Sequence, residues 1–174
     1  MTPAKPAAGT ISRDPAISST TELSLRAKYY LHPGQLFAST DSHEVTTILG
    51  SCVAVCLWDP DVKIGGINHY LLPSFSGAGD ASARFGDISI RELLAKLTTL
   101  GCDRRRLKAK IFGGACVLEA FRNQKDHLGS QNIRTARELL AAEAIPVIGE
   151  SVGGQRGRKL IFATDDGSAW VKVL

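Results

Sequence analysis

The sequence predicts a single domain of the α+β class. Its 174 residues are enough for one domain with a full hydrophobic core, but few for two. Short β-prone segments are numerous and helical patterns are few, and the two kinds do not alternate in the regular order of a parallel βαβ sheet. A content of 44% hydrophobic and 22% charged residues is that of an ordinary globular protein.

We expect residues 1–25 to form a disordered tail and residues 26–174 to form the domain. The start of the chain is rich in Ala, Pro, Ser and Thr and has no hydrophobic periodicity. It lacks the apolar core of a secretory signal, and no apolar run approaches the roughly 20 residues that span a bilayer. The sequence therefore predicts a cytoplasmic protein with reduced thiols and no membrane insertion.

The first half of the domain is predicted to consist of strands. Residues 29–38 indicate one or two short strands broken by a Pro-Gly turn, and residues 45–49 are a further strand candidate. Residues 53–58 are continuously apolar and β-prone, which is typical of a buried strand. The turn at 59–61 leads into a strand within 63–72, because Pro presets φ and Asp bonds nearby backbone groups.

The second half mixes helices and strands. A capping box at 89–92 and an apolar stripe predict a helix that ends at Gly101, and a second amphipathic helix is expected from about 130 to 143. The remaining segments are strand candidates, with a closing hairpin around Asp165-Asp166-Gly167, and they cover residues 107–112, 146–152, 159–164 and 168–173. Residues 73–86 are a loop, which is either a gate beside the preceding strand or a plain surface connection.

Cys52 and His69 are the candidate catalytic pair. If the turn is centred between Pro60 and Asp61, position i pairs with position 121 − i, and Cys52 then lies directly opposite His69. Opposed residues of an antiparallel pair have Cβ atoms roughly 4.5–5.5 Å apart on one face of the sheet. A thiol paired with an imidazole has a lowered pKa, so a thiolate becomes available near neutral pH.

The alternative for a cysteine in an apolar strand is a small buried hydrophobe. Cys52 follows Gly50-Ser51 at the mouth of a strand, and two glycines precede His69 and allow close backbone approach. These features favour catalysis. Thr46 lies six residues before Cys52, so strand parity places it on the same face, where its hydroxyl would orient the imidazole; selection for a β-branched residue is the alternative.

The other cysteines and histidines suggest no site. Cys56 shares the face of Cys52, but a Cys-x₃-Cys pair with one histidine is a poor zinc signal, so core packing is the preferred interpretation and no metal is expected. Cys102 and Cys116 have no partner nearby in the sequence. The glycines at 113–114 lack the spacing of a phosphate loop, and no cofactor is expected.

The net charge of +4 fits an acidic protein partner better than a nucleic acid, because no aromatic residues are interleaved with the basic clusters. Those clusters lie at 104–110 and at 156–159. Each is either a solvated face or a surface for an acidic partner.

Three segments resemble the chemoreceptor glutamine deamidase family CheD. They are TTILGSCVAV at 46–55, GGINHYLLP at 65–73 and KIFGGA at 110–115, with further similarity in the glycine- and basic-rich region from 153 to 164. The resemblance covers about residues 30 to 173. It implies a β-sandwich with flanking helices, similar to the cytotoxic necrotizing factor toxins.

The resemblance implies hydrolysis of selected glutamines to glutamate on chemoreceptor cytoplasmic helices. It names Cys52 as nucleophile, His69 as base and Thr46 as third member, without metal or organic cofactor. Backbone amides near Ser51, with Gly50 supporting the turn, would hold the developing oxyanion. Family members also bind a CheC-type phosphatase, so a regulatory binding module with little turnover is the alternative to an enzyme. A generic cysteine peptidase or transamidase is disfavoured.

Overall fold

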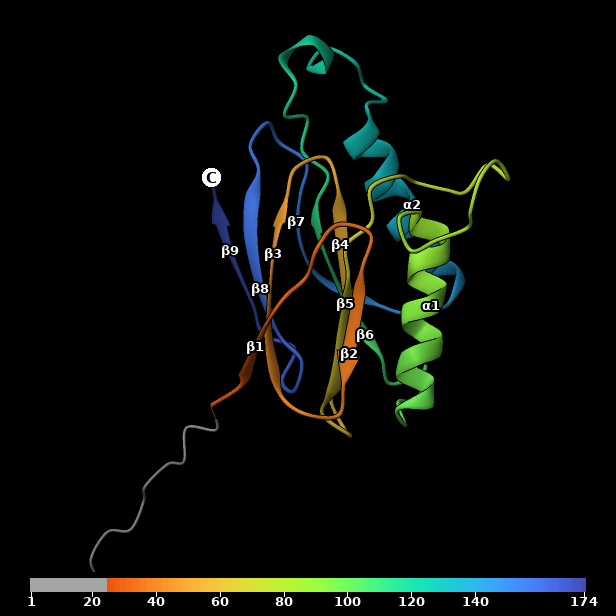
Figure 1. The fold of residues 1–174 in the computed structure, drawn as a ribbon, viewed down its shortest axis with the longest axis vertical. Helices are drawn as coiled ribbons and strands as arrows, with labels where there is room; N and C mark the ends of the chain where they lie inside the picture. The colour runs from red at the N-terminus through yellow and green to blue at the C-terminus, as the bar shows by residue number, and fades with distance from the viewer. Residues whose placement is uncertain (1–24) are drawn as a thin grey trace, which may run out of the picture.

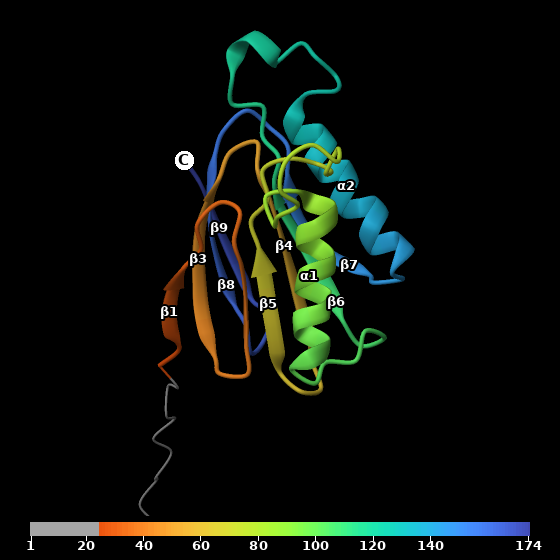
Figure 2. The same cartoon turned by 45° about the vertical axis from the view of Figure 1, so that its right-hand side comes forward.

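The computed structural model describes residues 25–174, and the predicted tail at 1–25 lies almost wholly outside them. Two sheets pack face to face, and both helices cover the outer face of the larger sheet (Figures 1 and 2). The fold is therefore α+β with a β-sandwich and flanking helices, as predicted.

The smaller sheet has the strand order β1-β3-β8-β9. Strand β1 runs parallel to β3, and the other neighbours are antiparallel. Its strands are β1 (Ala27–Tyr30), β3 (His43–Leu49), β8 (Arg158–Ala163) and β9 (Ala169–Val173).

The larger sheet has the strand order β2-β5-β4-β6-β7. Only the β6–β7 pair is parallel. Its strands are β2 (Leu36–Ser39), β4 (Val53–Asp59), β5 (Ile64–Asn68), β6 (Lys108–Gly113) and β7 (Val147–Val152).

Helices α1 (Gly86–Thr99) and α2 (Leu128–Ala142) follow β5 and β6 along the chain, and a 3₁₀ turn (Glu119–Phe121) precedes α2. Helix α1 begins three residues before the predicted capping box. Ser89 is buried in its first turn and cannot cap it, and Phe85 is the residue before the helix. The apolar stripes of both helices pack on the larger sheet.

Strand β4 separates two hydrophobic layers. Its alternate residues Val53, Val55 and Leu57 face the helices, whereas Ala54 and Cys56 face the smaller sheet. A strand buried on both faces reads as a continuous apolar run, which is why the sequence pattern at 53–58 predicted it. The Cys52 side of the chain thus borders the layer between the two sheets.

The predicted hairpin register is wrong by two residues. Asp59 pairs with Ile64 and Cys56 with Ile67, so opposed positions sum to 123, not 121. The turn holds four residues rather than two, because the Asp59 carboxylate accepts the Asp61 amide at 3.0 Å and Lys63 takes a left-handed φ of 56°. Composition alone did not reveal the longer turn.

Candidate active site

Cys52 lies at the corner where the chain leaves the smaller sheet and enters β4. Its carbonyl accepts the Gly114 amide at 2.8 Å, and the Gly50 carbonyl accepts the Ala115 amide at 2.8 Å. Gly113 has a φ of +103°, and a Cβ there would lie 2.2 Å from the Cys52 carbonyl oxygen. Only glycine fits at this position, so the turn after β6 holds the backbone of the candidate nucleophile.

His69 follows β5 and is held by the Pro-Gly turn between β1 and β2. Its amide donates to the Gln35 carbonyl at 2.9 Å, and its carbonyl accepts the Gly34 amide at 2.7 Å. Next to His69, the regular backbone pairing between β4 and β5 is interrupted. There the Val55 amide donates to the side-chain oxygen of Asn68 at 2.7 Å. His69 is 1% exposed, and its backbone is therefore fixed from the β2 side of the sheet.

The true register makes Cys52 and His69 diagonal neighbours. Val53 pairs with Tyr70 through two backbone hydrogen bonds of 3.1 and 3.0 Å, which places Ala54 opposite His69 and Cys52 two positions along. Parity still puts both side chains on the face toward the smaller sheet. Diagonal neighbours lie roughly 7–8 Å apart, and among residues 25–174 no hydrogen bond joins the thiol to the imidazole.

Thr47 fixes the tautomer of His69. Its hydroxyl donates to the Leu31 carbonyl at 2.8 Å, and its oxygen lies 2.8 Å from His69 Nδ1. A hydroxyl has one proton, so an oxygen that donates to a carbonyl must accept from Nδ1–H. Nε2 is then the unprotonated nitrogen, and it is buried without a partner among the described residues. The imidazole presents a lone pair, as a general base requires.

Thr46, the residue expected in this role, has no hydrogen bond to His69. It is half-buried on the other face of β3, opposite Ile161, whereas Thr47 is fully buried toward β4. Thr46 would share the face of Cys52 only if residues 46 to 52 formed one unbroken strand. Instead the chain changes sheets at 50–52, and the alternation does not carry across the corner.

Burial favours the neutral forms of both candidate groups. It lowers the pKa of His69 from 6.5 to about 4 and raises the pKa of the Cys52 thiol, the latter partly offset by the residue's own amide. The resting site therefore holds a thiol and a neutral imidazole rather than a preformed ion pair. This contradicts the lowered thiol pKa expected from the sequence, and it leaves proton transfer to the moment of attack.

We expect Thr47→Val to lower kcat roughly 10- to 100-fold. The change removes the acceptor of Nδ1–H, so the imidazole can also adopt the tautomer in which Nε2 carries the proton and cannot act as a base. A buried hydrogen bond of this kind contributes about 1–3 kcal/mol. Thr46→Val is the matched control, since it removes the same hydroxyl one residue away and should leave kcat at the wild-type value. Turnover of both variants tests this, and a larger loss in the Thr46 variant would contradict it.

We expect His69 to make folding stability depend on pH. Its pKa is about 4 in the fold and near 6.5 when unfolded, so the unfolded chain takes up a proton between these values. Neutral His69 makes its full contribution to the free energy of unfolding above pH 6.5. About 3 kcal/mol of this free energy is lost as the pH falls to 4. Urea unfolding of wild type and His69→Gln at several pH values measures it. Identical pH dependence in the two proteins would show that His69 is not buried in neutral form.

Comparisons with known proteins identify the family of this chain. A family model described as "CheD chemotactic sensory transduction" matches residues 71–173. A protein of Anaeromyxobacter dehalogenans named "Probable chemoreceptor glutamine deamidase CheD 1" is 46% identical over 92% of this chain and 92% of its own. The chain belongs to the CheD family.

Other relatives carry the name "Probable chemoreceptor glutamine deamidase CheD". The CheD protein of Sulfurimonas denitrificans is 40% identical, with 84% of this chain and 94% of its own covered. That of Rhodospirillum rubrum is 40% identical, with 84% and 82% covered. The solved structure of the Bacillus licheniformis hypothetical protein YfiH aligns with 62% of this chain and 46% of its own at 17% identity and a TM-score of 0.40, too distant to bear on the fold.

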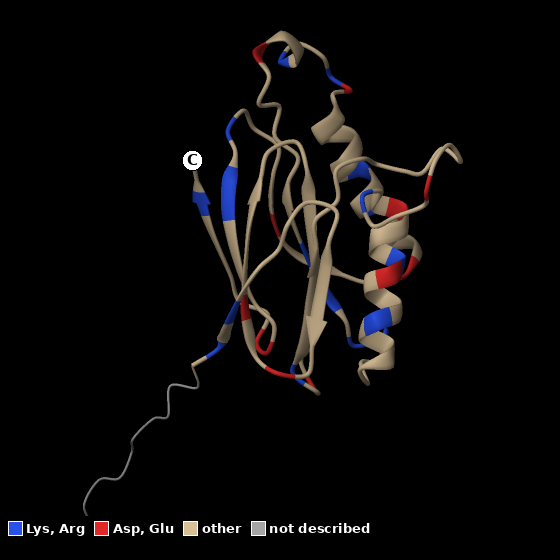
Figure 3. Ribbon diagram, in the orientation of Figure 1, with Lys and Arg blue, Asp and Glu red and all other residues tan. Residues whose placement is uncertain are grey.

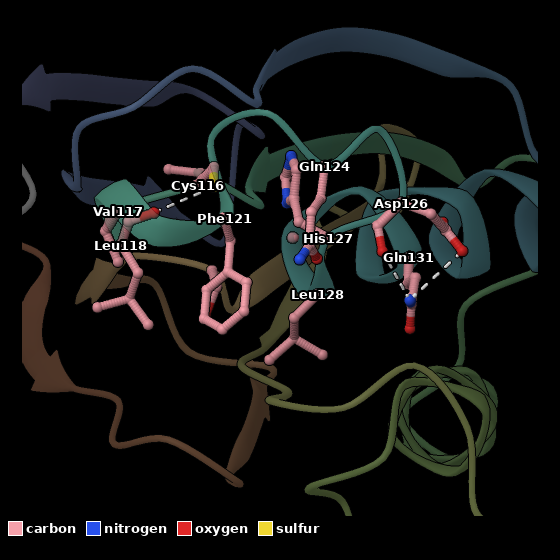
Figure 4. Close-up of a pocket in the computed structure, with 12 residues that line it drawn as sticks. Cys116, Val117, Leu118, Phe121, Gln124, Asp126, His127, Leu128 and Gln131 are labelled. Atoms are coloured by element: carbon pink, nitrogen blue, oxygen red, sulfur yellow. Dashed lines mark hydrogen bonds between the residues drawn. The ribbon is translucent and has the colours of Figure 1, made fainter.

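A cavity of about 410 Å³ adjoins the Cys52 corner of this CheD chain. Ser51 and Cys116 line it, and the side chains of Leu118, Phe121 and Leu128 point the same way along it (Figure 4). Each of these three apolar side chains is between 38% and 60% exposed. No sequence pattern indicates this surface, because the segment between β6 and α2 has no regular periodicity.

The two basic clusters differ in how far their charges are paired. The three consecutive arginines each meet a carboxylate, in the pairs Arg104–Glu143, Arg105–Asp103 and Arg106–Asp59. Arg158 of the second cluster is buried, and its guanidinium donates to the carbonyls of Ser151 and Gly153. Lys and Arg are scattered over several elements rather than gathered on one (Figure 3). The arginines of the first cluster are therefore paired, whereas Arg156 and Lys159 of the second cluster are exposed.

All four cysteines are free thiols. Within residues 25–174, no group of three or more His, Cys, Asp or Glu side chains is arranged to hold a metal ion. In the same part of the chain, no helix is long and apolar enough to cross a membrane.

Proposed function

We propose that this protein hydrolyses selected glutamine side chains to glutamate on the cytoplasmic helices of chemoreceptors. The observation that carries the proposal is the hydrogen-bonded chain from the Leu31 carbonyl through Thr47 to His69, which leaves Nε2 as a base on the same face as Cys52. The names of its CheD relatives supply the substrate class. The reaction would take place in the cytoplasm, where those helices lie.

The proposed reaction begins with proton transfer from the Cys52 thiol to His69 Nε2. The sulfur attacks the carboxamide carbon of the glutamine, and the Nε2 proton passes to the departing nitrogen, which leaves as ammonia. Nε2 then takes a proton from water, the resulting hydroxide attacks the thioester, and the sulfur leaves and regains its proton. The sum is glutamine and water to glutamate and ammonia, with no metal or organic cofactor.

The amides of Ser51 and Cys52 are proposed to hold the oxyanion. The carbonyls of Gly50, Ser51 and Cys52 each accept a hydrogen bond, which fixes this turn. Among the described residues, neither the Ser51 nor the Cys52 amide donates to another residue, and the Cys52 amide interacts only with its own thiol. Preorganised amides that point at developing charge stabilise it without reorganisation. Gly50 helps to fix the turn that carries these amides, because its carbonyl accepts the Ala115 amide.

The apolar cavity beside Ser51 is the proposed surface for the helix that carries the glutamine. Apolar anchors on one face of a helix fit a groove of this kind. The alternative function is a regulatory binding module that holds a chemoreceptor, or a CheC-type phosphatase, at the same surface with little turnover.

The deciding experiment incubates the wild-type protein with a purified chemoreceptor cytoplasmic fragment. Ammonia is measured in solution and glutamine-to-glutamate conversion by peptide mass spectrometry. Equal amounts of ammonia and new glutamate are expected. If the fragment binds but neither ammonia nor new glutamate appears, the protein is a binding module and not a deamidase.

A further inference from the structure

Asn132 joins the two segments that carry Cys52 and His69. It lies in the second turn of α2 and is fully buried. Its Nδ2 group donates to the Ser51 carbonyl at 3.0 Å and to the Leu71 carbonyl at 2.9 Å. One amide group therefore binds the residue immediately before the nucleophile and a residue two positions after the base.

The two segments have few other direct connections at this point. The backbone pair Val53–Tyr70 is the last one before the chains separate, because Leu71 donates its own amide to Arg84 at 2.9 Å. The Ser51 and Leu71 carbonyls are half-buried, and Asn132 donates to both of them. Without this side chain, the direct link between the two carbonyls would be lost.

Asn132 is itself held in place. The Tyr70 hydroxyl donates to its backbone carbonyl at 2.5 Å, so the residue after His69 is bound to the same turn of α2. Tyr70 is fully buried within the layer between the larger sheet and the helices. Helix α2 thus acts as a rigid support for both catalytic segments, on the side opposite the smaller sheet.

We infer that Asn132 is a positioning residue that sets the spacing between the Cys52 thiol and His69 Nε2. The two side chains are diagonal neighbours, and their approach depends on how closely Ser51 and Leu71 are held together. A misplacement of about 1 Å in such a pair lowers a rate roughly 100-fold. The expected effect on kcat rests on the proposed function, whereas the hydrogen bonds of Asn132 do not depend on it.

The test uses Asn132→Ser, Asn132→Ala and Asn132→Asp. Serine keeps one donor on a shorter side chain, alanine keeps none, and aspartate keeps the shape but turns an oxygen toward the two carbonyls. We expect kcat for the receptor fragment to fall about 10- to 100-fold, least for serine, with KM unchanged. Leu140→Ala is the control for lost stability, because Leu140 is buried in α2 away from Cys52 and His69 and should keep wild-type kcat below its melting temperature.

A second readout needs no receptor. The rate of Cys52 alkylation by iodoacetamide at neutral pH reports how well the imidazole takes the thiol proton. The Asn132 variants should be alkylated more slowly than the wild type, with His69→Gln as the lower limit. The wild type could show His69-dependent alkylation of Cys52 and yet deamidate nothing. That result would contradict the proposed function but support the positioning role of Asn132.

Wild-type kcat and a wild-type alkylation rate in a folded Asn132 variant would overturn the inference. Near-ultraviolet circular dichroism establishes that each variant is folded. The serine variant makes the smallest change and decides the matter if the other two do not fold.

Discussion

Cys52→Ala is expected to reduce ammonia release from a receptor fragment to the level of an enzyme-free sample, a loss on the order of 10⁴-fold or more. Removal of the sulfur removes the only protein atom that bonds to the carboxamide carbon in the proposed reaction. Ammonia and peptide mass spectrometry provide the measurement.

Cys116→Ala is the matched control for that prediction. Cys116 is also a free thiol and lines the cavity beside Ser51, but its sulfur makes one weak contact, 3.7 Å to the Leu118 carbonyl. Its variant should turn over at close to the wild-type rate. A loss in Cys116→Ala equal to that in Cys52→Ala would assign the chemistry to the cavity rather than to the Cys52 corner.

His69→Gln is expected to lower kcat roughly 10²- to 10⁴-fold, the range for loss of a general base. The effect should be large because burial keeps the pKa of Cys52 high, so the thiol yields little thiolate without a base. Glutamine has a similar length, and its amide can still donate to Thr47. KM for the receptor fragment should be unchanged, because the imidazole is buried behind the thiol.

The control for His69→Gln is His43→Gln. His43 begins β3, and its Nδ1 lies 2.9 Å from the Asp41 carbonyl, remote in sequence from Cys52. Its variant should keep the wild-type kcat. If His69→Gln also turned over normally, the proton of the thiol would have to leave by another route.

Much of the fold could be predicted because its strands carry local signals. The continuous apolar run at 53–58 and the Pro-Gly turn at 33–34 each predict the element that the structure contains. Cys52 and His69 could be placed on one face because side-chain direction depends only on parity, and an error of two residues in register preserves parity. Their separation along the strands depends on the length of the turn, which Asp59 and Lys63 determine through specific backbone geometry.

Two parts of the candidate site depend on contacts that local pattern does not contain. Thr46 and Thr47 are adjacent and of the same type, and only the change of sheet at the Cys52 corner decides which of them faces His69. Asn132 occupies the position four residues before Ala136 on the apolar face of α2. A polar side chain on the apolar face of a helix indicates that it has hydrogen-bond partners in the fold, because a buried polar group requires them. The sequence does not show which residues those partners are.

The most direct test of a Cys52 thioester is competition between water and hydroxylamine during turnover of the receptor fragment by the wild-type enzyme. An acyl group on sulfur can be transferred to either nucleophile, so the modified glutamine should appear as glutamate and as glutamyl hydroxamate, with a ratio that follows the hydroxylamine concentration. Cys52→Ala should give neither product. Undiminished ammonia release with glutamate as the only product at every hydroxylamine concentration would contradict covalent catalysis by Cys52.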